Sequence, residues 1–383
     1  MQYRQFGNTN YKVSALGFGC MRFPLNSDEQ DDVNEEEAIR MVRHAIDEGV
    51  NFVDTAYPYH KGESEVVVGK ALKNGYRKKV RLCTKSPTFF MESADDFDRY
   101  LHEQLERLQD DYIDYYLLHS INQDNWDNVV KKYNLLEKAE KARQEGLIGH
   151  IGFSFHDNYP FFKEVIDAYP WEMCLLQYNY LDVHTQAGHQ GVKYAASRGV
   201  PVVVMEPLKG GKLAAPPEPV REMLDEAVPE RSPYDWALQW LWDQPEVSVV
   251  LSGMSAMEQV KANLSAADKS GINTLNKNEK KLLEEDVHRK LNELFLVTCT
   301  GCHYCMPCPE KVNIPLFLEI FNDGYAYDDL EKKRSTYERF GKRAQSCTAC
   351  RECEDKCPQG IKISEWMAQT HRVLGEGEPY EKK

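Results

Sequence analysis

The sequence predicts an α/β fold in which a (β/α)8 barrel is followed by a small α-helical domain. Short apolar segments alternate with helical patterns along the first 275 residues, which is the signature of repeated βα units around a parallel sheet. Eight of the 11 cysteines lie in the last 85 residues. The length of 383 residues allows one large and one smaller domain. We therefore expect a barrel over 1–275 and a cysteine-rich domain over 276–383.

Eight apolar segments of strand length account for the expected barrel. They are 13–19, 51–55, 80–84, 113–119, 148–154, 173–179, 201–206 and 247–253. Before the first strand, residues 3–6 and 11–13 flank the turn sequence Gly-Asn-Thr-Asn and predict a β-hairpin.

The stretch 35–48 illustrates the helices expected between these strands. Asn34 and Glu37 have the spacing of a capping box, with Asn in place of the usual Ser or Thr, and the amphipathic run ends at Gly49. In the second domain, leucine periodicity over 276–296 predicts a helix that leads into the cysteines, and the segment between the two cysteine runs is also helical in pattern.

Four reactive side chains follow the ends of three consecutive predicted strands. Asp54 lies at the end of the second strand and Tyr59 follows it, Lys85 comes directly after the third strand, and His119 ends the fourth. Because active sites of such barrels lie where strands end and βα loops begin, these side chains should converge.

The chemistry of these four residues suits the reduction of a carbonyl group. A phenol is a poor acid at neutral pH, but a neighbouring ammonium lowers its pKa, and a carboxylate can hold that ammonium in place. Tyr59 is then the acid, Lys85 its neighbour and Asp54 the anchor, while His119 orients or polarises the substrate oxygen.

The stretches "DTAYPY", "CTK" and "YYLLH" that carry these residues resemble the catalytic stretches of the aldo-keto reductases. "LGFGCMR", "GFS", "QYN" and "EPLKGGKL" extend the resemblance to roughly residues 1–270. It implies a nicotinamide cofactor, NAD(P)H, bound across the barrel mouth, and a small carbonyl or alcohol substrate. In keeping with this, no Gly-x-Gly-x-x-Gly sequence opens a helix after a strand.

The resemblance also implies a set of cofactor contacts. Ser154 and Gln177 would hold the carboxamide. The remaining contacts are Gly19, Cys20, Met21 and Asp54 at the first two strand ends, Met205, Pro207, Leu208, Gly211 and Leu213 around the pyrophosphate loop, and Gly253, Ser255, Gln259 and Asn263 at the adenosine end.

Three positions depart from the family pattern and leave the cofactor open. Phe155 replaces an asparagine, Met205 replaces the aromatic that stacks on nicotinamide, and Ala256 stands where an arginine often meets the 2′-phosphate. Loss of that arginine costs NADP more than NAD, although Lys261 is a turn away. Met205 also makes room for a larger ring, so FMN is an alternative occupant.

The cysteines form two runs that each end in Cys-Pro, which is ligand spacing for two [4Fe-4S] clusters. The second run matches the bacterial ferredoxin pattern, in which the fourth cysteine ligates the other cluster. Two such runs make a crossed pairing available, with Cys299, Cys302, Cys305 and Cys357 on one cluster and Cys308, Cys347, Cys350 and Cys353 on the other. The first run departs from the pattern, because two residues rather than three precede Cys308, and this leaves the assignment of Cys308 open. Zinc does not require four cysteines within ten residues, and disulfides would require an oxidising compartment.

The charge and the distribution of apolar residues exclude some classes of partner and of location. The net charge of −14 argues against nucleic acid, and no apolar stretch approaches the roughly 20 residues of a membrane span. The segment 1–4 lacks the apolar core of a signal peptide, so we expect a cytoplasmic protein.

Three functions fit these features. The first is an NAD(P)H-dependent carbonyl oxidoreductase whose clusters exchange electrons with a redox partner protein or a second cofactor. The second is an FMN-linked, ferredoxin-type reductase with the flavin in the barrel. The third is a redox-sensing, nucleotide-binding protein. The first has a difficulty, because hydride transfer moves two electrons whereas each cluster passes one.

Overall fold

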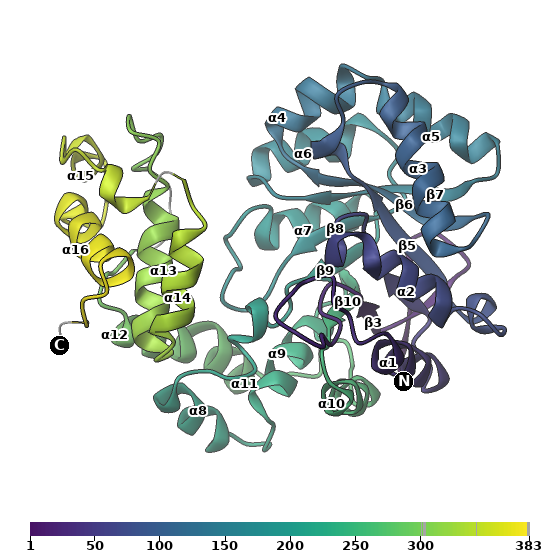
Figure 1. Ribbon diagram of the computed structural model, residues 1–383. Coiled ribbons are helices and arrows are strands. Elements are labelled where there is room, and N and C mark those ends of the chain that lie inside the picture. Colours follow the sequence, from purple (N-terminus) through teal and green to yellow (C-terminus); the bar gives the residue numbers. More distant parts are fainter. Residues whose placement is uncertain (300, 302–303, 342, 381–383) are drawn as a thin grey trace. The chain divides into compact units, whose positions relative to one another are not determined.

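The computed structural model describes residues 1–299, 301, 304–341 and 343–380. The chain divides into two compact units, coloured along the sequence in Figure 1. The first contains Met1–Ala214 and Tyr234–Glu279, and the second contains Ala215–Pro233 and Lys280–Lys383. Each unit has a hydrophobic core of its own.

The centre of the first unit is a closed barrel of eight parallel strands. The strand order around the barrel is β10-β3-β4-β5-β6-β7-β8-β9. The strands are β3 (Leu16–Gly19), β4 (Phe52–Asp54), β5 (Arg81–Ser86), β6 (Ile113–Ile121), β7 (Ile148–Phe155), β8 (Cys174–Gln177), β9 (Val202–Met205) and β10 (Val247–Gly253). The predicted (β/α)8 fold is confirmed.

The predicted hairpin is formed by β1 (Tyr3–Gln5) and β2 (Lys12–Ser14), which pair antiparallel. Just after β1, the ring of Phe6 is fully buried and contacts Phe52 and Tyr115, which lie near the starts of β4 and β6. The hairpin therefore closes the end of the barrel where the strands begin and leaves the other end for the βα loops.

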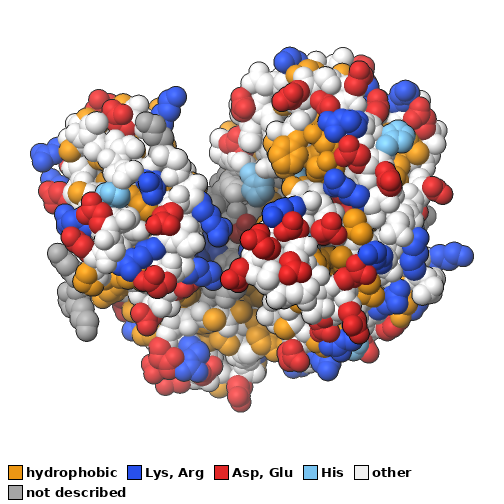
Figure 2. Space-filling model, in the orientation of Figure 1, with side chains coloured by type: hydrophobic (Ala, Val, Ile, Leu, Met, Phe, Trp, Pro, Cys, Tyr) orange, Lys and Arg blue, Asp and Glu red, His pale blue; other side chains and the backbone are white. Residues whose placement is uncertain are grey.

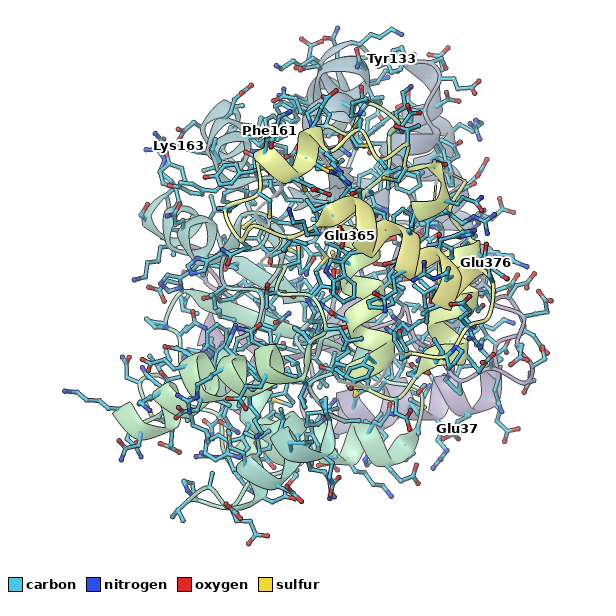
Figure 3. The ribbon with its side chains drawn as sticks, turned by 90° about the vertical axis from the view of Figure 1, so that its left-hand side faces the viewer. Glu37, Tyr133, Phe161, Lys163, Glu365 and Glu376 are labelled. Atoms are coloured by element: carbon cyan, nitrogen blue, oxygen red, sulfur yellow. The ribbon has the colours of Figure 1, made fainter. Side chains whose placement is uncertain are left out.

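Helices surround the barrel (Figure 1). They are α1 (Glu35–Asp47), α2 (Glu63–Ala71), α3 (Asp95–Leu108), α4 (Gln123–Asn125), α5 (Leu135–Gln144), α6 (Tyr159–Ala168), α7 (Gly188–Ser197), α9 (Pro233–Trp242) and α10 (Met257–Asp268). In α1 the side chain of Asn34 accepts a hydrogen bond from the backbone of Glu37 at 3.2 Å, which confirms the predicted N-cap (Figure 3 shows Glu37). Gly49, just past the helix, has a φ of 100°, which favours glycine.

The second unit is helical. It contains α8 (Glu218–Asp225), α12 (Val287–Leu294), α13 (Ile314–Ala326), α14 (Leu330–Glu338), α15 (Glu352–Asp355) and α16 (Ile363–Gly375). Figure 3 labels Glu365 near the start of α16 and Glu376 just after its end. The connecting helix predicted over 276–296 is observed as α11 (Lys277–Lys281), a π-helical turn (Leu282–Asp286) and α12.

The core of the second unit lies between α13, α14 and α16. Phe317, Phe321, Tyr337 and Met367 are among its buried side chains, and several cysteines pack against it. The side-chain amide of Asn322 on α13 pairs with both backbone groups of Val297, at 2.7 and 2.9 Å. This pairing fixes the chain just before the first cysteine run.

The surface carries charges of both signs, and acidic and basic side chains are interspersed over the face shown in Figure 2. Within the described residues, we find no helix long and apolar enough to cross a membrane.

Candidate active site and cysteine-lined cavity

The parallel register of β4, β5 and β6 brings the four reactive side chains predicted from the sequence to one end of the barrel. Asp54 is the last residue of β4 and pairs with Cys83 of β5, two residues before Lys85. Lys85 in turn pairs with Leu117 of β6, two residues before His119.

Lys85 is fully buried, and the structure accounts for all three hydrogens of its ammonium group. The Nζ atom donates to Asp54 Oδ1 at 2.7 Å, to the carbonyl of Thr55 at 2.7 Å and to Tyr59 Oη at 3.3 Å. Burial raises the pKa of Asp54, against the charge of Lys85. Burial lowers the pKa of Lys85, but the charges of Asp54, Tyr59 and Cys83 and the hydrogen bond to Asp54 together outweigh this effect, so the net shift is upward. The ammonium is therefore charged and fixed in orientation.

Tyr59 begins a short 3₁₀ turn (Tyr59–Gly62) that follows β4. The residue is partly buried, and the centre of its ring lies 4.7 Å from Lys85 Nζ. Burial raises the pKa of Tyr59, and the charge of Lys85 offsets only part of this rise. Lys85 thus acts in the expected direction, but desolvation dominates, so the phenol is protonated at neutral pH.

His119 lies beside Tyr59, with the two rings edge to face and their centroids 6.1 Å apart. Burial, and then the charges of Lys85 and His156, lower the pKa of His119 well below its usual value. Its Nδ1 is buried and has no hydrogen-bond partner among the described residues. His119 is therefore neutral. The exposed ring of Phe89 lies 5.2 Å from the imidazole and gives the site an apolar edge.

A buried hydrogen-bond network holds the backbone of Lys85 and the side chains next to it. The amide of Gln104 on α3 donates to the carbonyl of Lys85 at 3.1 Å and to Glu65 Oε1 at 2.6 Å. Thr84 Oγ1 donates to the same carboxylate oxygen at 2.6 Å, and Tyr116 Oη donates to Gln104 Oε1 at 2.7 Å. Sequence reasoning missed this network, because Glu65 and Gln104 look like ordinary polar helix positions.

The residues expected at the nicotinamide lie on β7 and β8. Ser154 Oγ accepts from the backbone of Ser120 at 2.7 Å, which leaves its own hydrogen available to donate. Gln177 donates to Asp182 at 3.1 Å and accepts from Gln186 at 2.8 Å, which leaves one N–H and one lone pair. These donors and acceptors fit a carboxamide.

The residues at the ends of β3 and β9 differ in exposure. Gly19 pairs with Gly253 of β10, the next residue, Cys20, is fully buried, and Met21 is 54% exposed. Met205 ends β9 and is partly buried. Of these side chains, Met21 is therefore the one that solvent reaches most, and the thiol of Cys20 is shielded from it.

The predicted pyrophosphate loop, 207–213, follows β9. Gly210 and Gly211 have φ values of 66° and 101°, and a Cβ atom on either would meet nothing within 4 Å. Leu208 is partly exposed, whereas Pro207 and Leu213 are buried and hold the loop. The open side of the two glycines leaves room for a phosphate group.

The residues expected at the adenosine end surround the start of α10. Ser255 and Gln259 are exposed and bond to each other, with a backbone N to Oε1 distance of 2.8 Å. Asn263, in contrast, is buried, and its amide donates to Ser252 at 2.9 Å. Arg22 lies against Gly253. Sequence reasoning did not assign Arg22, although it ends the "LGFGCMR" stretch.

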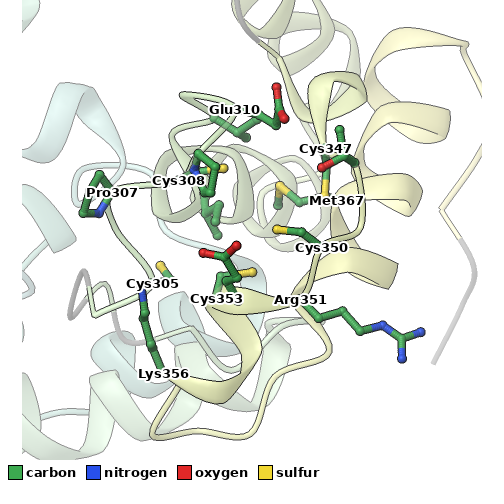
Figure 4. A pocket seen from close by; sticks show the side chains of 15 residues that line it. Cys305, Pro307, Cys308, Glu310, Cys347, Cys350, Arg351, Cys353, Lys356 and Met367 are labelled. Atoms are coloured by element: carbon green, nitrogen blue, oxygen red, sulfur yellow. The ribbon is translucent and has the colours of Figure 1, made fainter.

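In the second unit, five of the eight predicted cluster cysteines line one cavity (Figure 4): Cys305, Cys308, Cys347, Cys350 and Cys353. Apolar side chains, among them Val312 and Ile314, and charged residues such as Glu310 and Lys356 also line it, and the side chain of Arg351 points away from it in Figure 4.

Of the other predicted ligands, Cys299 and Cys357 do not line this cavity. Cys299 and Cys357 pack against the core of the second unit, and Cys302 lies outside the described residues. None of the ten described cysteines is in a disulfide. In the described part of the chain, no three Cys, His, Asp or Glu side chains are grouped closely enough to hold a metal ion.

The donor set of the cavity suits an iron–sulfur cluster, because five cysteines line one space. Burial raises the pKa of Cys353 to about 11, and the nearby Cys347, Glu354 and Cys305 add to this rise. Crowded thiolates repel one another, and bound iron would offset that repulsion.

A closed parallel barrel with a buried Asp–Lys–Tyr–His set, joined to a unit with a thiol-lined cavity, defines an oxidoreductase. The aldo/keto reductase family matches residues 15–278, and the 4Fe-4S dicluster domain matches residues 298–362. The chain therefore belongs to the aldo/keto reductase family and carries a 4Fe-4S dicluster domain.

Relatives and solved structures match the barrel. L-Galactose dehydrogenase of Arabidopsis thaliana is 33% identical over 289 residues, which cover 70% of this chain and 88% of that protein. An uncharacterised oxidoreductase of Bacillus subtilis is 26% identical, covering 75% and 94%. The holo form of an aldo-keto reductase from Bacillus halodurans superposes with a TM-score of 0.63 at 28% identity, covering 74% of this chain and 96% of the other.

Proposed function

We propose that this enzyme reduces a small carbonyl compound, or oxidises the corresponding alcohol, with NAD(P)H. The observation that carries the proposal is the set of three bonds from Lys85 Nζ to Asp54, Thr55 and Tyr59. A buried cation held in this way beside a phenol stabilises negative charge that develops on the phenol oxygen as it gives up its proton.

Tyr59 Oη is the proton donor in this proposal, and His119 orients the substrate oxygen. Because the pKa of His119 is lowered, its ring donates or accepts a hydrogen bond without adding a second positive charge beside Lys85. When bound, the nicotinamide cofactor supplies the hydride. Ser154 and Gln177 would hold its carboxamide, and the 207–213 loop its phosphates.

The substrate class follows from weaker observations. One relative is named L-galactose dehydrogenase, so hydroxylated aldehydes and their alcohols are the first compounds to assay. A further solved structure, of an aldo/keto reductase from Klebsiella pneumoniae, is a complex with NADP and acetate. At 22% identity that structure shows the shared fold alone.

For the second unit, we propose two [4Fe-4S] clusters that pass electrons to or from a redox partner or a second cofactor. Four of the five cavity cysteines, Cys308, Cys347, Cys350 and Cys353, form the set that crossed pairing assigns to one cluster, whereas the fifth, Cys305, is assigned to the other. Cys299, Cys302, Cys305 and Cys357 would hold the other cluster. When present, the clusters supply one-electron transfer.

The test of the barrel chemistry is Tyr59→Phe, assayed for aldehyde reduction with NADH and with NADPH. Removal of the phenol oxygen should lower kcat/KM by about 10²- to 10⁴-fold, while iron content stays unchanged. Undiminished turnover by the Tyr59→Phe variant would show that Tyr59 is not the proton donor. A second experiment distinguishes the two candidate cofactors. The bound cofactor is extracted from the anaerobically purified protein, and recovery of FMN in place of a nicotinamide nucleotide would favour the flavin alternative.

The role of the clusters has its own experiment. The anaerobic, oxidised protein is mixed with NAD(P)H in a stopped-flow instrument, and the absorbance of the clusters is followed with and without added flavin. Bleaching within the turnover time supports electron exchange with the barrel. Absorbance that never changes under either condition would take the clusters out of the reaction path.

A further inference from the structure

A relay of polar side chains crosses the barrel mouth from the loop after β9 to the loop after β7. Lys209 Nζ donates to Asp182 Oδ1 at 2.7 Å, and Gln177 Nε2 donates to Asp182 Oδ2 at 3.1 Å. Gln186 Nε2 then bonds to Gln177 Oε1 at 2.8 Å and to His156 Nδ1 at 3.4 Å. Asp182 and Gln186 belong to no site predicted from the sequence, and Lys209 lies within the predicted pyrophosphate loop.

The carboxylate of Asp182 determines which group donates and which accepts in each hydrogen bond of this relay. Burial raises its pKa, but Lys209 and the amides of Asn179 and Gln177 outweigh that effect, so its net pKa is lowered and it is ionised at neutral pH. An ionised carboxylate only accepts hydrogen bonds. Gln177 must therefore turn its NH₂ toward Asp182 and its oxygen toward Gln186.

The imidazole of His156 is constrained in the same way. Because Gln177 presents an oxygen, Gln186 must present its NH₂, and that group also faces His156 Nδ1. The network thereby fixes the amide orientation and the tautomer. Nδ1 of His156 is an acceptor, so its hydrogen is on Nε2, where it can be donated.

His156 lies close to the reacting end of the barrel. Its backbone N–H donates to the carbonyl of Ile121 at 2.9 Å, two residues along β6 from His119. A charge on His156 would lower the pKa of His119, so the two rings are within electrostatic reach. Both imidazoles are neutral, because burial also lowers the pKa of His156, although the Gln186 bond opposes that shift.

We propose that His156 is a specificity-determining residue, whose Nε2–H donates a hydrogen bond to a second oxygen of the substrate, on the carbon next to the reacting carbonyl. Tyr59 and His119 already serve the reacting oxygen, so the neighbouring donor selects α-hydroxy carbonyl compounds and, in the other direction, the corresponding vicinal diols. This inference rests on the proposed function. It adds the substrate class.

The test compares glycolaldehyde with acetaldehyde, which differ by one hydroxyl group. A site built to bond a hydroxyl discriminates against the analogue that lacks it, and we expect the wild type to prefer glycolaldehyde by about tenfold or more in kcat/KM. His156→Phe should bring this ratio to about one. His156→Gln, which keeps an N–H donor, should restore part of it.

The ratio of the two kcat/KM values is the readout, since a general loss of stability changes both values alike. His102→Phe, an exposed position on α3, is the matched control and should keep the wild-type ratio. A His156→Phe variant that keeps the wild-type preference would overturn the inference. So would a wild type that reduces both aldehydes equally well.

Nitrogen-15 NMR of the histidine rings tests the relay apart from turnover. The wild type should show His156 as the Nε2–H tautomer, identified by the resonance that His156→Gln removes. In Asp182→Asn the side chain at position 182 can donate as well as accept, so the amides of Gln177 and Gln186 can adopt either orientation. This variant should therefore show a mixture of the two His156 tautomers. If neither aldehyde is reduced, the proposed function fails and the substrate class with it. If aldehydes are reduced but His156 is an Nδ1–H tautomer, only the inference fails.

Discussion

The barrel site and the cysteine cavity are held in place by different means. In the barrel, Asp54, Lys85 and His119 lie on strands of fixed register, and Lys85 already makes its three hydrogen bonds. In the second unit, Cys305, Cys308, Cys347 and Cys350 lie between helices and face an open cavity. Strand register organises the first site, whereas bound iron would have to organise the second.

This difference implies that the two sites can be damaged separately. A substitution among the barrel residues should leave the iron content intact, and a cysteine substitution should leave the barrel intact. Two measurements test that separation, and a third tests the electrostatics of the barrel site; they are given from the largest expected effect to the smallest.

Replacement of the buried lysine should have the largest effect. In Lys85→Met the phenol of Tyr59 loses its neighbouring cation, so kcat/KM for aldehyde reduction should fall by about 10²- to 10⁴-fold, with unchanged iron per chain. Lys79→Met, at an exposed lysine paired with Asp47, is the control and should change kcat/KM by less than about twofold. A Lys85→Met enzyme that is folded by circular dichroism and fully active would contradict the assignment.

Loss of one predicted cluster ligand should have a smaller and local effect. Cys308→Ser should reduce iron and sulfide to about half, because one of two clusters loses a thiolate, while the circular dichroism of the barrel is kept. Thr348→Ser, which lines the same cavity, should keep the full iron content. Full iron in Cys308→Ser would exclude this cysteine as a ligand.

The smallest predicted effect is the pH dependence of stability due to His119. Its folded-state pKa is lowered, so below about pH 6.5 the unfolded chain binds a proton that the folded chain does not. Between pH 6.5 and 5.5 the wild type should therefore lose about 1 kcal/mol more of unfolding free energy than His119→Gln. Urea unfolding at the two pH values measures this difference. Equal losses in both proteins would show that His119 is not held neutral.

The barrel was predictable because its signals are local. Alternation of apolar strands with helices gave eight strands close to their observed bounds, and Asp54, Lys85 and His119 followed from their positions at strand ends. The cap formed by Asn34 was likewise visible as a spacing within four residues.

What could not be predicted depends on side chains from distant elements. Gln104 reaches Lys85 from α3, and Gln186 links Gln177 to His156. No periodicity or spacing reports such pairings. The net rise in the pKa of Tyr59 was missed for a related reason, since the effect of a neighbouring charge can be read from a motif, whereas desolvation depends on the packed surroundings.

The chain passes between the two units more than once, and this affects both how a gene fusion could have produced the enzyme and how the enzyme can be truncated. The helix α8 interrupts the barrel sequence after β9, yet it packs against α12 and belongs to the second unit. A gene fusion that appended a ferredoxin would need a single junction, whereas here the two parts share three crossings of the chain, at 214/215, 233/234 and 279/280. Truncation before residue 280 would therefore leave Val220 and Leu224 of α8 without the surface that buries them, and the shortened protein should aggregate.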